Sequence, residues 1–123
     1  MSIFMSRKQF HKQIVNQSVK ELFERFVASQ TDKGVSDKTL ETYHSHLHCI
    51  ARYLDLTIPM DDLRQEDLED MILSMRRSGL ANNSISSYLR VFRTFLNWAK
   101  REGHTNLELP RYKEKETVKE TYL

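Results

Sequence analysis

The chain has few of the residues that interrupt or cross-link a fold. Its 123 residues include three glycines and two prolines, too few for the many tight turns of a β-rich fold. The single cysteine, Cys49, cannot form an internal disulfide, which is typical of a reducing cytoplasm. No apolar run approaches the ~20 residues that cross a bilayer, and residues 1–10 lack the apolar block of a secretory signal. We therefore expect a cytoplasmic, helical protein without a membrane partner.

Charge is present in both signs but is unevenly distributed. The net charge is only +2. Residues 61–70 nevertheless contain six acids and one base, a balance of −5, whereas residues 82–103 contain four bases and one acid, a balance of +3. One acidic and one basic segment are expected if a single side of a domain meets a polyanion.

Four segments carry apolar residues at helical spacing, and capping or stopping residues separate them. The first helix is expected to run from Ser18 to Gly34, with Glu21 completing a capping box at its start, and the second is expected to start at Ser36 or Asp37. The third is expected to start beyond Pro59 and end at Gly79, and the fourth to run from Asn82 or Asn83 to about Gly103. The expected buried residues are Val19, Leu22, Phe23, Phe26 and Val27, then Leu40, Tyr43, Leu47, Ile50, Ala51 and Leu54, then Leu68, Met71, Ile72 and Met75, then Ile85, Tyr88, Leu89, Phe92, Phe95, Leu96 and Ala99.

These segments predict an all-α bundle of four main helices. Residues 18–110 form the predicted domain, residues 1–17 a flexible basic arm or helical extension, and residues 111–123 a charged, flexible linker.

The predicted fourth helix has an outer side rich in cations and hydrogen-bonding groups and free of acids. Phosphate oxygens and base edges are bound by such groups, and an ordinary solvated face usually mixes Glu with Lys. The free N–H groups at the start of this helix, near Asn83 and Ser84, offer a further phosphate site. The pattern therefore favours nucleic acid over a plain solvated face. The outer side comprises Asn83, Ser87, Arg90, Thr94, Asn97 and Arg101, with Ser86, Arg93 and Lys100 beside them.

The predicted second helix repeats this pattern more weakly. Glu41 lies at the edge of its outer face and dilutes the charge, so this face alone would be interpreted as solvent-exposed. The face comprises Lys38, Thr42, Ser45, Cys49 and Arg52, flanked by Thr39 and His46.

Other motifs favour structural roles. His44 and His48 have the spacing of a metal-binding pair, but no third ligand follows at suitable spacing, so no metal or other cofactor is predicted. Phe92, Phe95 and Trp98 are interpreted as core packing rather than a stacking platform. No nucleophile motif, glycine-rich loop or acid–base pair indicates catalysis.

The order of short motifs resembles the N-terminal core-binding domain of the tyrosine recombinases, the phage-integrase family. The resemblance covers about residues 18–110. It rests on Val35–Tyr43 (VSDKTLETY), Leu63–Leu68 (LRQEDL), Gly79–Ile85 (GLANNSI) and Tyr88–Gly103 (YLRVFRTFLNWAKREG).

The resemblance implies a SAM-like orthogonal bundle that forms half of a clamp around the recombination site in double-stranded DNA. It places the second and fourth helices against the DNA, although Glu41 departs from the bases common in relatives. Together with the outer faces described above, the predicted DNA contacts are Lys38, Thr39, Thr42, Ser45, Asn83, Ser84, Ser87, Arg90, Arg93, Asn97 and Arg101.

In the family, catalysis belongs to a separate C-terminal domain, so this chain is expected to be a DNA-binding module and not itself an enzyme. Tyr122 is not expected to act as a nucleophile, because nothing around it would bind a scissile phosphate. The implied partners are DNA, the catalytic domain of the parent protein and other recombinase protomers. The alternative is a helical protein-interaction module that uses the acidic third helix and has no role on DNA.

Overall fold

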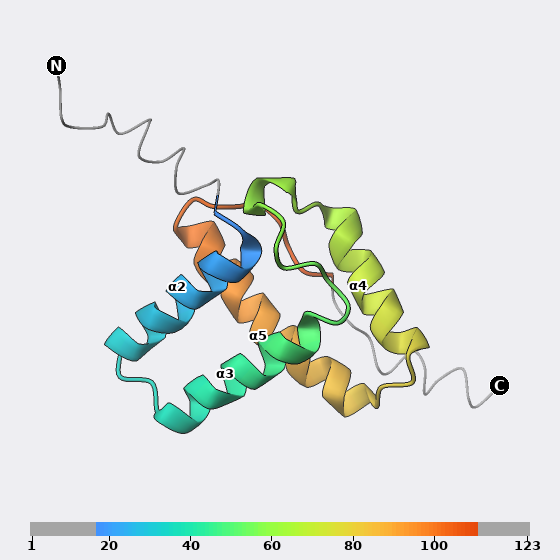
Figure 1. Cartoon of the computed structure of the whole chain (residues 1–123), viewed down its shortest axis with the longest axis horizontal. Helices are drawn as coiled ribbons and strands as arrows, with labels where there is room; N and C mark the ends of the chain where they lie inside the picture. Colours follow the sequence, from blue (N-terminus) through green and yellow to red (C-terminus); the bar gives the residue numbers. More distant parts are fainter. Residues whose placement is uncertain (1–16, 111–123) are drawn as a thin grey trace, which may run out of the picture.

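The computed structural model describes residues 17–110, which form four α-helices and a short 3-10 helix (Figure 1). In chain order these are α2 (Val19–Asp32), α3 (Asp37–Ile50), η1 (Met60–Asp62), α4 (Gln65–Arg77) and α5 (Asn82–Arg101). This part of the chain has no β-strand, so the predicted all-α fold is confirmed. None of its helices is both long and apolar enough to span a bilayer. Residues 1–16 of the predicted arm, the predicted linker and Tyr122 lie outside the described residues.

The predicted capping box starts α2. The Glu21 N–H donates to Ser18 Oγ at 3.1 Å, and the Ser18 N–H donates to Glu21 Oε1 at 3.0 Å. The pKa of the Glu21 carboxyl is lowered, first because the carboxylate accepts the hydrogen bond from the Ser18 N–H and second because it interacts with the Ser18 hydroxyl. The next free amide is satisfied by a distant loop, since the Val19 N–H donates to the Ile58 carbonyl at 3.0 Å. The first turn of α2 is therefore tied to the segment that precedes η1.

Gln17 also belongs to this folded unit, although the sequence assigned it to the arm. Its carbonyl accepts a hydrogen bond from the Met60 N–H at 2.8 Å, and its Oε1 accepts one from Arg25 Nη1 at 2.8 Å. The contacts of the folded domain thus include Gln17, one residue before the predicted domain boundary at Ser18.

Helix α5 runs through the middle of the bundle, with α2 and α3 on one side and α4 on the other (Figure 1). An aromatic cluster fills the space between these helices. The Phe95 ring lies 5.0 Å from Phe23, 5.5 Å from Phe92, 5.9 Å from Phe26 and 6.4 Å from Trp98, measured between centroids. All five side chains are buried. The interpretation of Phe92, Phe95 and Trp98 as core residues is confirmed.

The predicted buried faces of α2 and α4 are confirmed in full, and that of α5 is buried except for half-buried Tyr88. On α3, Leu47 and Ile50 are buried, while Leu40 and Tyr43 are half-buried against the core. The prediction for Ala51 is wrong, because α3 ends at Ile50 and Ala51 is its exposed C-cap. The following turn nevertheless returns Leu54 to the core. Helical periodicity failed here because the helix ends one turn earlier than the apolar pattern suggests.

The start of α5 differs from the prediction. Ala81 is the N-cap, with φ −63° and ψ 147°, so the predicted cap at Asn82 or Asn83 is wrong. The Ile85 N–H donates to the Ala81 carbonyl at 3.1 Å, which begins the helix one residue early. Gly79 just before it has φ +86°, a left-handed conformation that glycine adopts without strain. This residue ends α4, as predicted.

Candidate nucleic-acid interface

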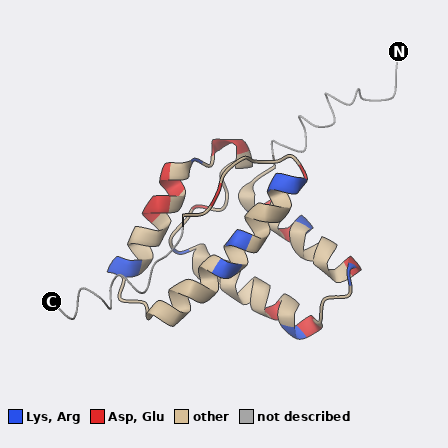
Figure 2. Ribbon diagram, turned by 180° about the vertical axis from the view of Figure 1, so that it is seen from behind, with Lys and Arg blue, Asp and Glu red and all other residues tan. Residues whose placement is uncertain are grey.

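The acid-free outer side of α5 is present in the structure. We call Asn83, Ser87, Arg90, Thr94, Asn97 and Arg101 the α5 strip; all are exposed except half-buried Ser87. Within its 20 residues α5 contains four bases and no acid. In Figure 2, α5 lies in front and carries Lys and Arg positions but no Asp or Glu, whereas acidic positions lie on α4 and η1 and also on α2 and α3. The charge separation expected from the sequence is therefore a separation between elements in space.

Arg90 and Arg93 are the cations best placed for a ligand. Arg90 is exposed, and Arg93 is half-buried on the flank of the α5 strip. Within residues 17–110 no carboxylate lies within ion-pair distance of either guanidinium. Each guanidinium keeps its full charge and five N–H donors, and its planar fork matches a phosphate or a guanine edge.

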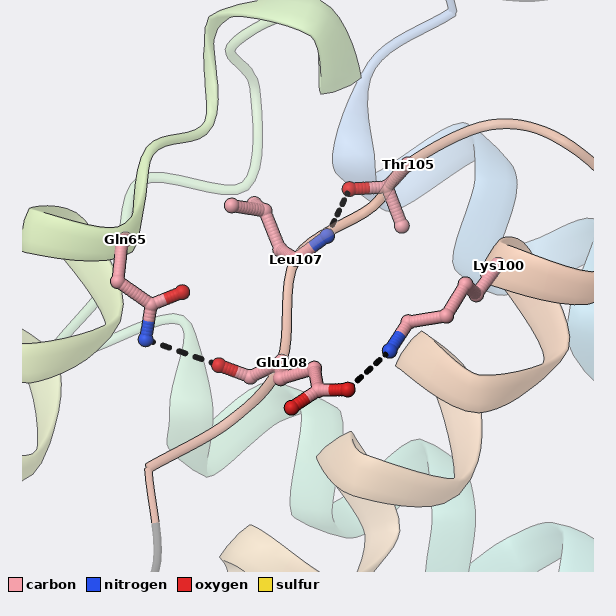
Figure 3. A network of polar contacts seen from close by, with 5 residues as sticks. All are labelled: Gln65, Lys100, Thr105, Leu107 and Glu108. Carbon is pink, nitrogen blue, oxygen red and sulfur yellow. Dashed lines mark hydrogen bonds and ion pairs between the residues drawn. The ribbon is translucent and has the colours of Figure 1, made fainter.

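Lys100, also beside the strip, is engaged elsewhere. Its Nζ forms an ion pair with Glu108 Oε1 at 3.0 Å, and the Glu108 carbonyl accepts a hydrogen bond from Gln65 Nε2 at 2.9 Å. Figure 3 shows this network, in which the Leu107 N–H also donates to Thr105 Oγ1 at 3.1 Å. The segment after α5 thus connects α5 to α4, and its Glu108 offsets part of the charge of Lys100.

Arg101 lies among side chains of both charge signs, unlike Arg90. It borders a cavity of about 370 Å³ at the ends of α2 and α5. Arg25 and Lys33 line the same cavity, but so do Asp32 and Glu102. Because opposite charges share this space, we expect Arg101 to attract a polyanion less than Arg90 does.

The exposed face of α3 offers fewer free donors than its sequence suggests. Lys38, Thr42 and Ser45 are exposed, but Thr42 Oγ1 donates to the Lys38 carbonyl at 3.1 Å. Thr39 is half-buried, and its hydroxyl lies 2.9 Å from that of the N-cap Ser36. A phosphate oxygen can only accept hydrogen bonds, so a hydroxyl must release its present acceptor before it donates. Lys38 and Ser45 are therefore the readier contacts on this helix.

Helices α3 and α5 meet at a cluster that the sequence did not indicate. The rings of His46 and Tyr88 lie 5.1 Å apart in an edge-to-face contact. A hydrogen bond with the Cys49 thiol raises the pKa of the Tyr88 hydroxyl, with burial as the second cause. Both contacts cross from one predicted DNA-binding helix to the other. The cluster therefore adds polar and ring contacts to the core packing that holds the two faces together.

The three neighbouring histidines do not form one site. His46 is half-buried against α5, whereas His44 and His48 are exposed and border a cavity of about 360 Å³ on the side of α2. Lys20 and Asp55 also line that cavity. Among residues 17–110 no three His, Cys, Asp or Glu side chains gather as metal ligands.

We expect His46 to make the stability of the domain sensitive to acid. Burial is the larger effect on this imidazole and lowers its pKa below the ordinary 6.5, although a hydrogen bond with the Ser87 backbone opposes it. The unfolded chain therefore binds a proton at a pH where the folded domain does not. His46 contributes stability above pH 6.5 that is lost as pH falls through the lower, folded pKa.

We expect the unfolding free energy of the chain, measured by urea denaturation, to decline as the pH falls below 6.5, the ordinary pKa of the imidazole in the unfolded chain. His46→Gln removes the titrating group and should flatten this decline, while its stability at neutral pH drops somewhat because the Tyr88 contact is lost. Glu21 and Asp55, whose pKa values are also lowered, act in a more acidic range. Equal slopes for the two proteins would contradict the assignment to His46.

The family model described as the phage integrase SAM-like domain matches residues 11–117. The chain belongs to the phage integrase SAM-like domain family. The match extends beyond the described residues at both ends.

Known proteins similar to this SAM-like domain include two curated tyrosine recombinases named XerD. The protein of Listeria monocytogenes is 25% identical over 75 residues, and that of Listeria innocua is 29% identical over 76 residues. Each match covers 58% of this chain but 25% of the relative, so the aligned part spans a quarter of the relatives' length. Among solved structures, the core-binding domain of bacteriophage lambda integrase matches with a TM-score of 0.61 and 22% identity. That match covers 76% of this chain and 98% of the other, and shows that the two share a fold.

Within this SAM-like domain, none of the predicted DNA contacts is buried. They lie on two helices that pack directly against each other through the His46 and Tyr88 contact. Seven are exposed, namely Lys38, Thr42, Ser45, Asn83, Arg90, Asn97 and Arg101, and four are half-buried, namely Thr39, Ser84, Ser87 and Arg93.

Proposed function

We propose that the domain binds duplex DNA through the α5 strip and the exposed face of α3. The observation that carries this proposal is the composition of the α5 surface, which presents cations, amides and hydroxyls and no carboxylate along 20 residues. Phosphates accept hydrogen bonds from all of these groups, and Arg and Asn also read base edges in the major groove. At the start of α5, the N-cap Ala81 provides no side-chain acceptor, which leaves the amides of Asn83 and Ser84 available to a phosphate.

We propose further that the domain is the DNA-binding module of a site-specific tyrosine recombinase or integrase. In that arrangement residues 18–110 form half of a clamp on the core recombination site, and a separate catalytic domain cuts and rejoins the DNA through a tyrosine nucleophile. The charged segment 111–123 would lead toward that domain. Other recombinase protomers on the same DNA would be its protein partners. The family membership and the similarity to the XerD proteins support this assignment.

A role in protein interaction alone is less well supported for the α5 strip. Protein-binding faces usually expose apolar or aromatic anchors at their centre. The aromatic residues of α5 instead lie in the core or at the contact with α3, and the exposed residues are polar.

A titration of the purified chain with duplex DNA at increasing salt tests the DNA-binding proposal. With about four phosphate contacts, the slope of log affinity against log salt should be roughly −0.9 per contact, so binding is weak at physiological salt and much tighter at low salt. A control titration with an uncharged backbone analogue should show little binding. Affinity that stays constant as salt rises would contradict an interface built on cations and phosphates.

A further inference from the structure

The segment after α5 brings a carboxylate back to a helix that has none of its own. Gly103, with φ +83°, reverses the chain at the end of α5, and the residues that follow return toward α4. There the Glu108 carboxylate accepts a hydrogen bond from Lys100 Nζ at 3.0 Å (Figure 3). One of the four cations of α5 is therefore paired with an acid that a different segment supplies.

Lys100 lies in line with the cations proposed to bind DNA. It follows Arg93 by seven residues, so the two side chains start from the same side of the helix about 10 Å apart. It also follows Asn97 of the α5 strip by three residues, which makes these two neighbours on the helix surface. The Lys100 side chain is 32% exposed. Its ammonium group has three N–H donors and can extend the row of phosphate contacts toward the end of α5.

The backbone of Glu108 is held in place independently of its carboxylate. Its carbonyl accepts a hydrogen bond from Gln65 Nε2 on α4 at 2.9 Å. On either side of it, Leu109 is buried and Leu107 is half-buried against the core. The carboxylate can therefore leave Lys100 while the segment stays attached to α4 and to the core.

The ion pair between Lys100 and Glu108 is easily exchanged. The Glu108 side chain is 82% exposed even while it is paired. Ion pairs in such surroundings contribute little to stability, and salt weakens them. A phosphate oxygen carries the same sign of charge as a carboxylate and accepts the same hydrogen bonds, and a duplex presents a dense row of phosphates. A phosphate brought close by the α5 strip can therefore replace the Glu108 carboxylate.

On the basis of the proposed DNA-binding function, we propose that Glu108 competes with DNA for Lys100. In the free domain Glu108 holds the Lys100 ammonium group. When α5 binds a duplex, a backbone phosphate takes the place of the carboxylate, which turns to solvent. Lys100 is then a further DNA contact, and Glu108 lowers the affinity of the domain for DNA. The segment that follows α5 thereby has a polar contact to α5 in the free state that it lacks on DNA.

The salt dependence of binding tests whether Lys100 contacts a phosphate. Fluorescence anisotropy with a labelled duplex at several salt concentrations gives the slope of log affinity against log salt. Lys100→Gln should make this slope shallower by roughly one, as expected when one phosphate contact is lost. Lys20→Gln removes the same charge from the exposed surface of α2 and should leave the slope unchanged. A lysine that served only the fold would not change the slope either.

A double-mutant cycle tests the competition itself. Glu108→Gln keeps the size of the side chain and the backbone bond to Gln65 but removes the charge. It should tighten DNA binding roughly two- to fivefold at low salt, the range expected for release of an exposed ion pair. In the Lys100→Gln background the same substitution should have a clearly smaller effect, whereas a general effect of charge would persist without the lysine. Circular dichroism establishes that all variants remain helical.

The outcomes separate this proposal from the one on which it rests. If the unmodified chain showed no salt-dependent binding to the duplex, the proposed DNA-binding function would fail, and the competition would fail with it. If the chain bound but Lys100→Gln left the slope unchanged, Lys100 would not be a DNA contact. If Glu108→Gln had the same effect with and without Lys100, the two residues would not be coupled. Either of the last two results would overturn the competition alone.

Discussion

Replacing Phe95 with alanine is expected to lower the unfolding free energy by about 3–5 kcal/mol, the largest stability loss expected of a single substitution here. Phe95 is fully buried, and its ring contacts Phe23, Phe26, Phe92 and Trp98 on two helices. Removal of the ring leaves a cavity at the point where α2 and α5 meet. Urea denaturation followed by circular dichroism measures the loss.

Phe95→Leu is the matched control because it retains most of the apolar volume. It should lower the unfolding free energy clearly less than Phe95→Ala does, because the ring contacts are lost in both variants but leucine leaves a smaller cavity. If the unfolding free energy of Phe95→Ala lay less than about 1 kcal/mol below that of the unmodified chain, this result would contradict a core centred on the Phe95 ring.

The double substitution Arg90→Ala with Arg93→Ala is expected to give the largest loss of DNA affinity. An arginine that reads a base edge contributes about 1–3 kcal/mol, and one that contacts only phosphate contributes less. Loss of two phosphate-contacting cations should also make the salt slope shallower by roughly two. Fluorescence anisotropy with a labelled duplex at two or more salt concentrations measures both changes.

Lys20→Ala provides the control for general charge, because Lys20 is exposed on α2 and lies on neither predicted DNA-binding face. It should change binding little, and both variants should keep their helical content, since neither arginine is buried. If the double variant bound DNA as the unmodified chain does, α5 could not be the contact helix.

Much of the fold could be predicted because its determinants are local. The Ser18 and Glu21 capping box lies within one turn, and the buried residues of α2 and α4 repeat at the helical period. The errors arose where tertiary packing overrides local preference. Ala81 caps α5 although asparagine is the better capping residue, and the chain from Ala51 to Leu63 packs through contacts with Gln17 and Val19 that are distant in sequence.

The candidate interface was predictable in outline and less so in detail. The helical period shows which α5 residues share a side, because the helix is long and strongly amphipathic. It does not show that Lys100 is paired with Glu108, which requires the chain to reverse at Gly103. Nor does it show that His46 lies against Tyr88, because that contact depends on how α3 crosses α5.

The most direct test of the DNA-binding account is a nuclear magnetic resonance titration of the isotopically labelled chain with a short duplex at low salt. The account predicts that the backbone amides of α5 from Asn83 to Arg93 and those of α3 from Lys38 to Ser45 shift most. The amides around Glu69 and Leu73 on the outer face of α4 should stay nearly unchanged. Shifts that concentrate on α4 while the α5 strip remains unaffected would contradict the proposed interface.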